Sequence, residues 1–187
     1  KMKIIKIFLL ILYLSEYAYT QAEYQILTSS KNIFQLSANG ASLAISNENN
    51  YMNPASLKIQ DNKYGFSIIN YPADIKLYNF NLKNYSLSLL DFGQLKDQID
   101  DTVNKTFSAQ EILLKYYYNY KVRNLTFGAS LGGFNSNIYT YNSYGVIVSM
   151  GFIGKYNKIK SSFGLSIENL GYIIKSYTAF NLPTPLL

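Results

Sequence analysis

The sequence contains no cysteine and no histidine among its 187 residues. The lack of cysteine excludes disulfides, thiolate metal ligands and a cysteine nucleophile. The lack of histidine removes the commonest general base, the commonest metal ligand and the usual form of the catalytic triad. Carboxylates and lysines are still present, but an enzyme without histidine or cysteine is a minority case. We therefore expect a protein that is not an enzyme and that holds neither a cofactor nor a metal ion.

Long apolar runs are also missing. A membrane-spanning helix needs about 20 consecutive apolar residues, and the apolar run at the N-terminus covers only residues 7–14. Lys1, Lys3 and Lys6 precede this run, and small and polar residues follow it. This order is typical of a secretory signal peptide. We expect the signal over residues 1–21 and an exported mature chain.

The net charge of +6 does not gather into one basic patch. The chain has a single arginine, Arg123, and its lysines are scattered singly among tyrosine and asparagine. A nucleic-acid interface requires clustered basic residues on one face. We therefore do not expect nucleic acid among the partners.

From Tyr64 onward the sequence alternates between apolar and small or polar residues with a period of two, which indicates β-strands. Asn, Lys, Gly and Asp separate the alternating segments. Residues 23–57 show no such period and are expected to be irregular. The expected strands cover residues 64–71, 75–82, 85–92, 110–120, 123–134, 140–153 and 160–170.

The residues between the large apolar positions distinguish two kinds of β protein. Phe127, Val148 and Leu165 each lie in a strand whose other face is mainly Gly, Ser and Thr. A soluble sandwich turns large residues inward and charged residues outward, whereas a transmembrane barrel turns large residues toward lipid and small or polar ones toward the lumen. The scarcity of charge between the apolar positions favours the barrel. A secreted β-sandwich that binds glycans through tyrosines remains an alternative.

Strand length and tyrosine placement agree with the barrel. The later expected strands run for about ten residues or more, close to the 9–11 needed to cross a bilayer at a tilt. Tyr116, Tyr118 and Tyr120 fall on one face of a strand, as expected for an aromatic girdle at the membrane interface.

Motifs for chemistry are weak. Asp97, Asp100 and Asp101 stand close together in "DQIDD". Their spacing is not that of a helix-loop-helix calcium site, and they lie between expected strands. We interpret them as part of a solvated loop.

Five segments, in this order, resemble a known family: "LSANGASLAISNENNYMNPASL", "YGFSIINYPADIKLYNFNL", "LLDFGQLKDQID", "KTFSAQEILLKYYYNYKVRNLTFGASLGG" and "SSFGLSIENLGYIIKSY". Together they resemble the PorV/PorQ family of outer-membrane proteins of the type IX secretion system, closer to PorQ and distantly related to the FadL fatty-acid transporters. The resemblance covers roughly residues 30–187. The residues that carry it are Asn53, Pro54, Ala55, Ala73, Asp74, Phe107, Ala109, Glu111, Asn169, Leu170 and Gly171. Glu111 departs from the family pattern, in which an aspartate is usual.

The resemblance implies an all-β fold: a transmembrane antiparallel β-barrel of about 14 strands in the family, of which this chain supplies the first half. Residues 22–60 would form an N-terminal segment that plugs the lumen, and residues 61–187 would form the partial barrel. Within the plug, Pro54 would fix the backbone, Asn53 would bond backbone groups and Ala55 would permit close approach to the wall. We expect the sequence to be a C-terminally truncated piece of a longer protein; a closed barrel of about eight strands is the alternative.

The resemblance also implies a function. The protein would lie in the bacterial outer membrane, in contact with its lipid, and would aid cargo transfer or surface attachment through its loops and rim. Its partners would be other type IX secretion subunits and secreted cargo proteins. The alternative is a FadL-like channel for a hydrophobic small molecule, with the N-terminal segment as its gate.

Overall fold

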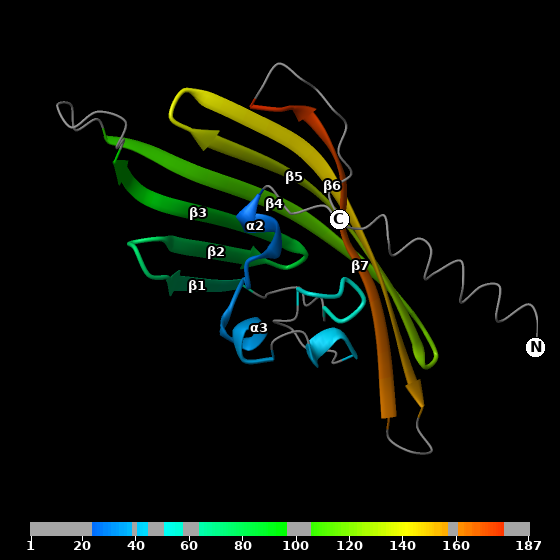
Figure 1. The fold of residues 1–187 in the computed structure, drawn as a ribbon. Helices are drawn as coiled ribbons and strands as arrows, with labels where there is room; N and C mark the ends of the chain where they lie inside the picture. Colours follow the sequence, from blue (N-terminus) through cyan, green and yellow to red (C-terminus); the bar gives the residue numbers. More distant parts are fainter. Residues whose placement is uncertain are drawn as a thin grey trace, which may run out of the picture.

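A computed structural model describes residues 24–38, 41–44, 51–57, 64–96, 106–156 and 161–177. These residues form one antiparallel sheet of seven strands, with short helical turns on one of its sides (Figure 1). The strands are β1 (Tyr64–Asn70), β2 (Lys76–Leu82), β3 (Tyr85–Lys96), β4 (Thr106–Val122), β5 (Leu125–Ile138), β6 (Tyr141–Tyr156) and β7 (Ser161–Lys175).

The sheet is a meander in which each strand pairs with the next one in the chain. It is strongly curved, and β1 and β7 lie at its two edges without pairing with each other (Figure 1). The prediction of an all-β, antiparallel fold is confirmed, and the sheet has the form of an open part of a barrel wall. Among the described residues, no helix is both long enough and apolar enough to cross a membrane.

All seven expected strands are present, but the later ones are longer than expected. β4 begins four residues before the expected start, and β7 continues five residues beyond the expected end. The extra residues of β4 include Thr106 and Ser108, and β5 ends in a polar run of Asn and Ser. Large apolar residues mark a strand clearly in a sequence; polar residues that continue the same ladder do not.

The expectation of irregular structure over residues 23–57 is wrong in part. Three short helical elements occur there: α2 (Gln25–Thr28), α3 (Ile33–Ala38) and η1 (Ala41–Ala44). Helices of four to six residues are not stable alone in water. They lie inside the curve of the sheet (Figure 1): α2 packs against β3 and β4, η1 packs against β6 and β7, and α3 packs against η1. We call residues 24–57, as far as they are described, the N-terminal segment.

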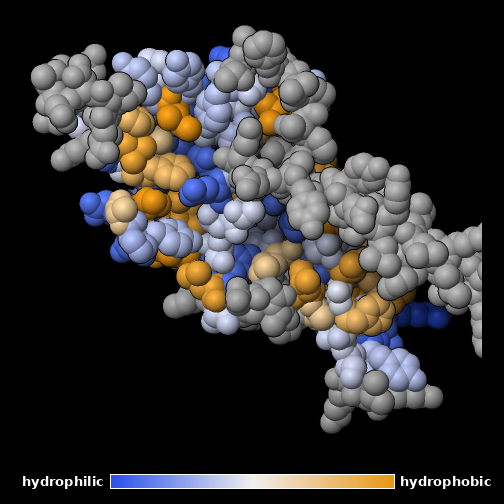
Figure 2. Space-filling model, in the orientation of Figure 1, coloured by the Kyte–Doolittle hydropathy of each residue, from blue (hydrophilic) through white to orange (hydrophobic). Residues whose placement is uncertain are grey.

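The concave face of the sheet, which carries this segment, is lined largely by small and polar side chains. On β5 and β6 it presents Ser130, Ser136, Ser143 and Ser149, all buried. Hydrophilic and hydrophobic residues are mixed over the side seen in Figure 2. This face is buried by the chain itself, so its serines need partners within the protein; Ser136, Ser143 and Ser149 have them, whereas Ser130 Oγ has none among the described residues.

The convex face carries the large apolar side chains, and they are exposed. Phe127 has 49% and Leu165 has 65% of its surface exposed, and neither is packed against a second sheet of the described residues. The register aligns such residues in rows across neighbouring strands. One row consists of Phe66, Phe80, Leu87 and Leu114, and the next consists of Tyr64, Leu82, Tyr85, Tyr116, Leu131 and Val148.

A polar row borders the apolar rows on the convex face. Its members are directly opposite one another on β1 to β6: Asn70, Lys76, Asp91, Gln110, Asn137 and Asn142. The apolar surface is therefore a band with a defined boundary, not a scatter of single exposed residues. Contiguous apolar surface of this size marks contact with lipid or with another protein.

Candidate functional site

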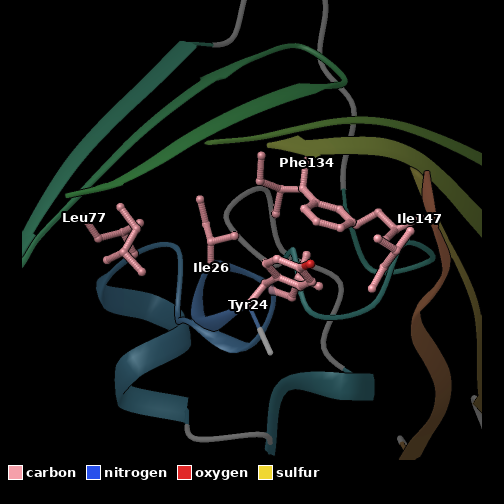
Figure 3. Packing of buried hydrophobic residues seen from close by; sticks show 9 residues of the cluster. Tyr24, Ile26, Leu77, Phe134 and Ile147 are labelled. Carbon is pink, nitrogen blue, oxygen red and sulfur yellow. The ribbon is translucent and has the colours of Figure 1, made fainter. Parts of the chain in front are cut away.

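The interface between the N-terminal segment and the concave face is the most elaborate polar arrangement of the described residues. At its first anchor, the Tyr24 ring lies 4.5 Å from the Phe134 ring, and its hydroxyl lies 2.5 Å from Ser143 Oγ. Tyr24 and Ile26 point from the segment into a cluster that includes Phe134 and Ile147 of the sheet (Figure 3). The start of the segment is thus held by both apolar packing and a hydrogen bond.

Glu111 holds the same stretch through its carboxylate. The Ile26 backbone N–H donates to Glu111 Oε2 at 2.7 Å, and Ser136 Oγ donates to Oε1 at 3.3 Å. Glu111 lies on the concave side of β4 and is buried. A carboxylate that accepts from backbone N–H makes a stronger bond than a neutral acceptor does.

The Asn53-Pro54-Ala55 motif is the second anchor. The Asn53 side chain is fully buried, and its Nδ2 donates to Leu43 O at 2.8 Å. The same Nδ2 lies 3.3 Å from two carbonyl oxygens of the wall, Phe152 O on β6 and Leu165 O on β7. Asn53 Oδ1 accepts from the Ala55 N–H at 2.9 Å, which closes an Asx turn. Both ends of this amide are therefore engaged with backbone groups.

Glycines of the wall make room for this motif. A Cβ on Gly128 would lie 2.1 Å from Ala55 N, and one on Gly151 would lie 1.9 Å from Asn53 Oδ1. Gly128 and Gly151 are directly opposite each other on β5 and β6. The sequence led us to assign the close approach to Ala55. The absence of side chains at Gly128 and Gly151 also contributes to this close approach.

A charged cluster lies between the two anchors. Lys115 Nζ donates to Asn169 Oδ1 at 2.8 Å and lies 3.6 Å from Glu168 Oε2. Asn169 Nδ2 in turn donates to Leu27 O at 3.0 Å. Asn169 interrupts β7 with a positive φ of 58°, beside the register shift at Val148 and Met150. This irregularity coincides with the place where consecutive residues Glu168 and Asn169 both join the concave cluster.

Lys31 brings a further positive charge from the N-terminal segment. Its Nζ donates to Ile26 O, and its own carbonyl accepts from Ser67 Oγ at 2.9 Å. Burial, together with the positive charge of Lys115, lowers the pKa of Lys31 to about 7; Glu111 acts in the opposite direction. The protonation of the interface is thus sensitive to pH near neutrality.

A cavity of about 460 Å³ lies between the segment and the wall. Its charged lining consists of Lys31, Lys115 and Glu168, and its apolar lining includes Leu27 and Tyr51. The volume is within the usual range for small-molecule sites. Charged side chains therefore lie beside apolar ones in the lining of this cavity.

The structure brings together some of the residues singled out in the sequence. Glu111 and Asn169 lie on the concave face and contact the N-terminal segment at Ile26 and Leu27 respectively. Ala109 is buried on the same side of β4. Phe107, near the start of β4, packs edge-on to Tyr139 at 6.2 Å between ring centroids.

Other singled-out residues lie elsewhere. Ala73 and Asp74 form the exposed turn between β1 and β2, where both have positive φ, 62° and 59°. Leu170 faces the convex side and is 36% exposed. Gly171 packs closely on β6, since a Cβ there would lie 2.6 Å from Val146 O. Asp97, Asp100 and Asp101 lie outside the described residues.

Sequence reasoning missed Lys31, Lys115 and Glu168. A signal for Lys115 was present in "EILLKYYY", where Glu111, Leu113 and Lys115 fall on the strand face opposite Tyr116 and Tyr118. Two charges on the strand face opposite a row of large apolar and tyrosine side chains indicate a polar interior. Within the described ranges, no group of acidic side chains is placed to hold a metal ion.

Comparison with known proteins gives no relative: no family model, no curated protein and no solved structure matches this chain.

We predict that Gly128→Ala loosens the second anchor. The new Cβ collides with backbone atoms of Pro54 and Ala55, and such overpacking typically costs about 1–3 kcal/mol. Amide hydrogen exchange of residues 51–57 should accelerate by roughly tenfold for each 1.4 kcal/mol lost. Gly133→Ala on the same strand is the control, because its Cβ meets only Gly145 O at 3.8 Å. Equal amide hydrogen exchange of residues 51–57 in the two variants would contradict the close packing of this stretch against Gly128.

We also predict that docking of the N-terminal segment strengthens as the pH rises from 7 to 9.5. A released Lys31 has a pKa near 10.5 and the docked one about 7, so within this window the released state binds more protons and is disfavoured by raising the pH. The urea midpoint should therefore rise with pH. Lys31→Met should reduce the rise, with the part due to buried Lys115 remaining, whereas Lys76→Met, at an exposed position, should keep all of it.

Proposed function

We propose that this chain forms part of the wall of a bacterial outer-membrane β-barrel, with the N-terminal segment in its lumen, and that it serves type IX secretion as a non-enzymatic component. The observation that carries the membrane part is the reversed polarity of the sheet. Large apolar side chains cover the exposed convex face, whereas the concave face carries mainly small and polar residues around a cluster of buried apolar ones. A water-soluble sheet has the opposite arrangement.

The height of the apolar band agrees with a bilayer. On β4 the outward positions from Ile112 to Val122 are all apolar or tyrosine, and Gln110 ends the run. Eleven residues at about 3.3 Å each extend roughly 36 Å, which a strand tilt near 45° reduces to about 25 Å. That is the height of the lipid-facing band of outer-membrane barrels.

The proposal includes further strands beside β1 and β7. An open sheet edge in hydrocarbon leaves backbone N–H and C=O groups without partners, each costing several kcal/mol. Strands that pair with these two edges complete the wall.

The role in secretion rests on the resemblance carried by Asn53, Pro54 and Ala55 together with Glu111 and Asn169. All five lie at the boundary between the N-terminal segment and the wall, where they make hydrogen bonds or close contacts across it. A lumen occupied in this way leaves the loops and rims for contact with cargo and partner subunits. For the alternative, a channel for a hydrophobic molecule, a route past the charges of Lys31, Lys115 and Glu168 is less favourable than a wholly apolar one.

We predict that a tryptophan at position 127 contacts lipid. The chain contains no tryptophan, so Phe127→Trp introduces a single probe on the convex face. In vesicles containing brominated phospholipid, its fluorescence should be strongly quenched. Phe134→Trp and Tyr51→Trp, which place the probe at buried positions on the inner side, should be quenched little. Equal quenching of inner and outer probes would contradict the orientation of the wall.

We further predict that cells lacking the protein retain type IX cargo in the periplasm while uptake of long-chain fatty acid stays normal. Cell fractionation followed by cargo immunoblotting measures the first, and labelled fatty acid measures the second. Re-expression of the unchanged gene should restore export. Normal export with lost uptake would instead support the channel.

A further inference from the structure

The cavity between the N-terminal segment and the wall is lined by more positive than negative charge. Lys31 joins the lining from the segment and Lys115 from β4. Glu168 of β7 is the only acidic side chain among the described residues that line it. Two ammonium groups and one carboxylate leave one positive charge of the lining without an opposite charge in the cavity.

The two ammonium groups repel each other, and the nearby carboxylates offset this only in part. After burial, the charge of Lys115 is the largest cause of the lowered pKa of Lys31. Glu111 acts in the opposite direction, but its carboxylate already accepts from a backbone N–H and a serine hydroxyl. Glu168 is likewise shared, since it accepts from Ser166 Oγ and lies 3.6 Å from Lys115 Nζ. An anion close to both lysines would relieve the repulsion.

Both lysines also keep hydrogen-bonding capacity for a ligand. Lys31 Nζ donates to Ile26 O, and Lys115 Nζ donates to Asn169 Oδ1. An ammonium group has three N–H donors, so these bonds, even with the Glu168 pair of Lys115, do not use all of them. An oxyanion in the cavity can therefore accept from either side.

The rest of the lining sets the size and character of the ligand. Leu27, Leu43 and Met52 supply apolar surface, and the volume of about 460 Å³ suits a small molecule. Residues 28–30, which also line the cavity, are exposed or half-buried. A ligand can thus enter past these residues while the N-terminal segment stays docked.

Two hydrogen bonds that join the N-terminal segment to β7 border the cavity. Asn169 Nδ2 donates to Leu27 O at 3.0 Å, and Ser166 Oγ donates to Met52 O at 3.3 Å. All four residues belong to the lining. A molecule bound here contacts both the segment and the wall, so it binds the docked state and stabilises that state by mass action.

We propose that this cavity binds a small organic carboxylate and that the bound carboxylate keeps the N-terminal segment docked. The carboxylate group lies between Lys31 and Lys115, where it accepts charge-assisted hydrogen bonds. Its compact apolar body packs on Leu27, Leu43 and Met52. This site goes beyond the role in secretion and does not depend on contact with lipid, because all of its groups belong to the segment and the concave face.

Three probes with the same ring isolate the effect of charge: benzoate, benzyl alcohol and benzylammonium. Isothermal titration calorimetry measures their binding to the full protein in detergent at about pH 6, where Lys31, with a pKa of about 7, is mostly protonated. We expect benzoate to bind at least about tenfold more tightly than benzyl alcohol, and benzylammonium to bind most weakly. Equal affinity for benzoate and benzyl alcohol, a preference for benzylammonium, or no binding of any probe overturns the proposal.

Two variants locate benzoate in the cavity. Ser30→Phe fills space in the lining without removing a charge, and Lys31→Met removes one ammonium group while keeping an apolar stem of similar length. Each should weaken benzoate binding by about tenfold or more. Lys76→Met, at an exposed position on β2, is the control and should bind benzoate as the unchanged protein does. Unchanged benzoate affinity in either cavity variant overturns the assignment.

Amide hydrogen exchange tests the effect on docking. The Ile26 N–H is bonded to Glu111 and the Leu27 N–H to Tyr24 O. Benzoate at ten times its dissociation constant should slow exchange of both amides by about tenfold, and benzyl alcohol at the same concentration should slow it much less. Benzoate binding without slower exchange overturns the effect on docking. Lipid quenching of the tryptophan at position 127 is independent of these results, so failure of the membrane location and failure of this site are distinguishable.

Discussion

The structure depends on one steric constraint: a chain segment has to lie against the inside of a curved sheet. Gly128, Gly151 and Gly164 leave the wall without side chains where the N-terminal segment touches it, since a Cβ on each would lie within 2.2 Å of that segment. Where the segment lies against these glycines, the concave face has no room for bulky side chains, and the neighbouring large residues Phe127 and Leu165 point to the convex face. The exposed apolar band and the buried polar interface are two results of one alternation.

The segment and the wall depend on each other for hydrogen bonding. Serine, asparagine and charged side chains on a buried face are costly unless they find partners. Here Glu111, Asn169 and Ser166 find them in backbone groups of the segment. In return, helical turns too short to persist alone are held in place. Substitutions in a polar interior of this kind are costly, because the loss of one hydrogen-bond partner leaves the other buried and unpaired.

The alternation of residues in β4 to β7 made the strands, their order and the outward direction of Phe127, Val148 and Leu165 predictable from the sequence. The sequence analysis expected Asn53 to bond backbone groups. It did not identify these groups as carbonyl oxygens of β6 and β7. Those partners are distant in the chain, and no local pattern encodes them. Helical turns in residues 24–44 escaped prediction because packing, not propensity, forms them. Lys31 and Glu168 escaped it because a single charge in a sequence does not reveal which residues will surround it.

The hydrogen bonds of Asn53 to the wall depend on the prior pairing of two strands. Its amide spans Phe152 O and Leu165 O, which belong to residues opposite each other on two different strands. Those acceptors exist as a pair only after β6 and β7 have come together. The stretch around Asn53 precedes all seven described strands in the chain, yet its hydrogen bonds to the wall can form only once β6 and β7, the last two of those strands, are paired.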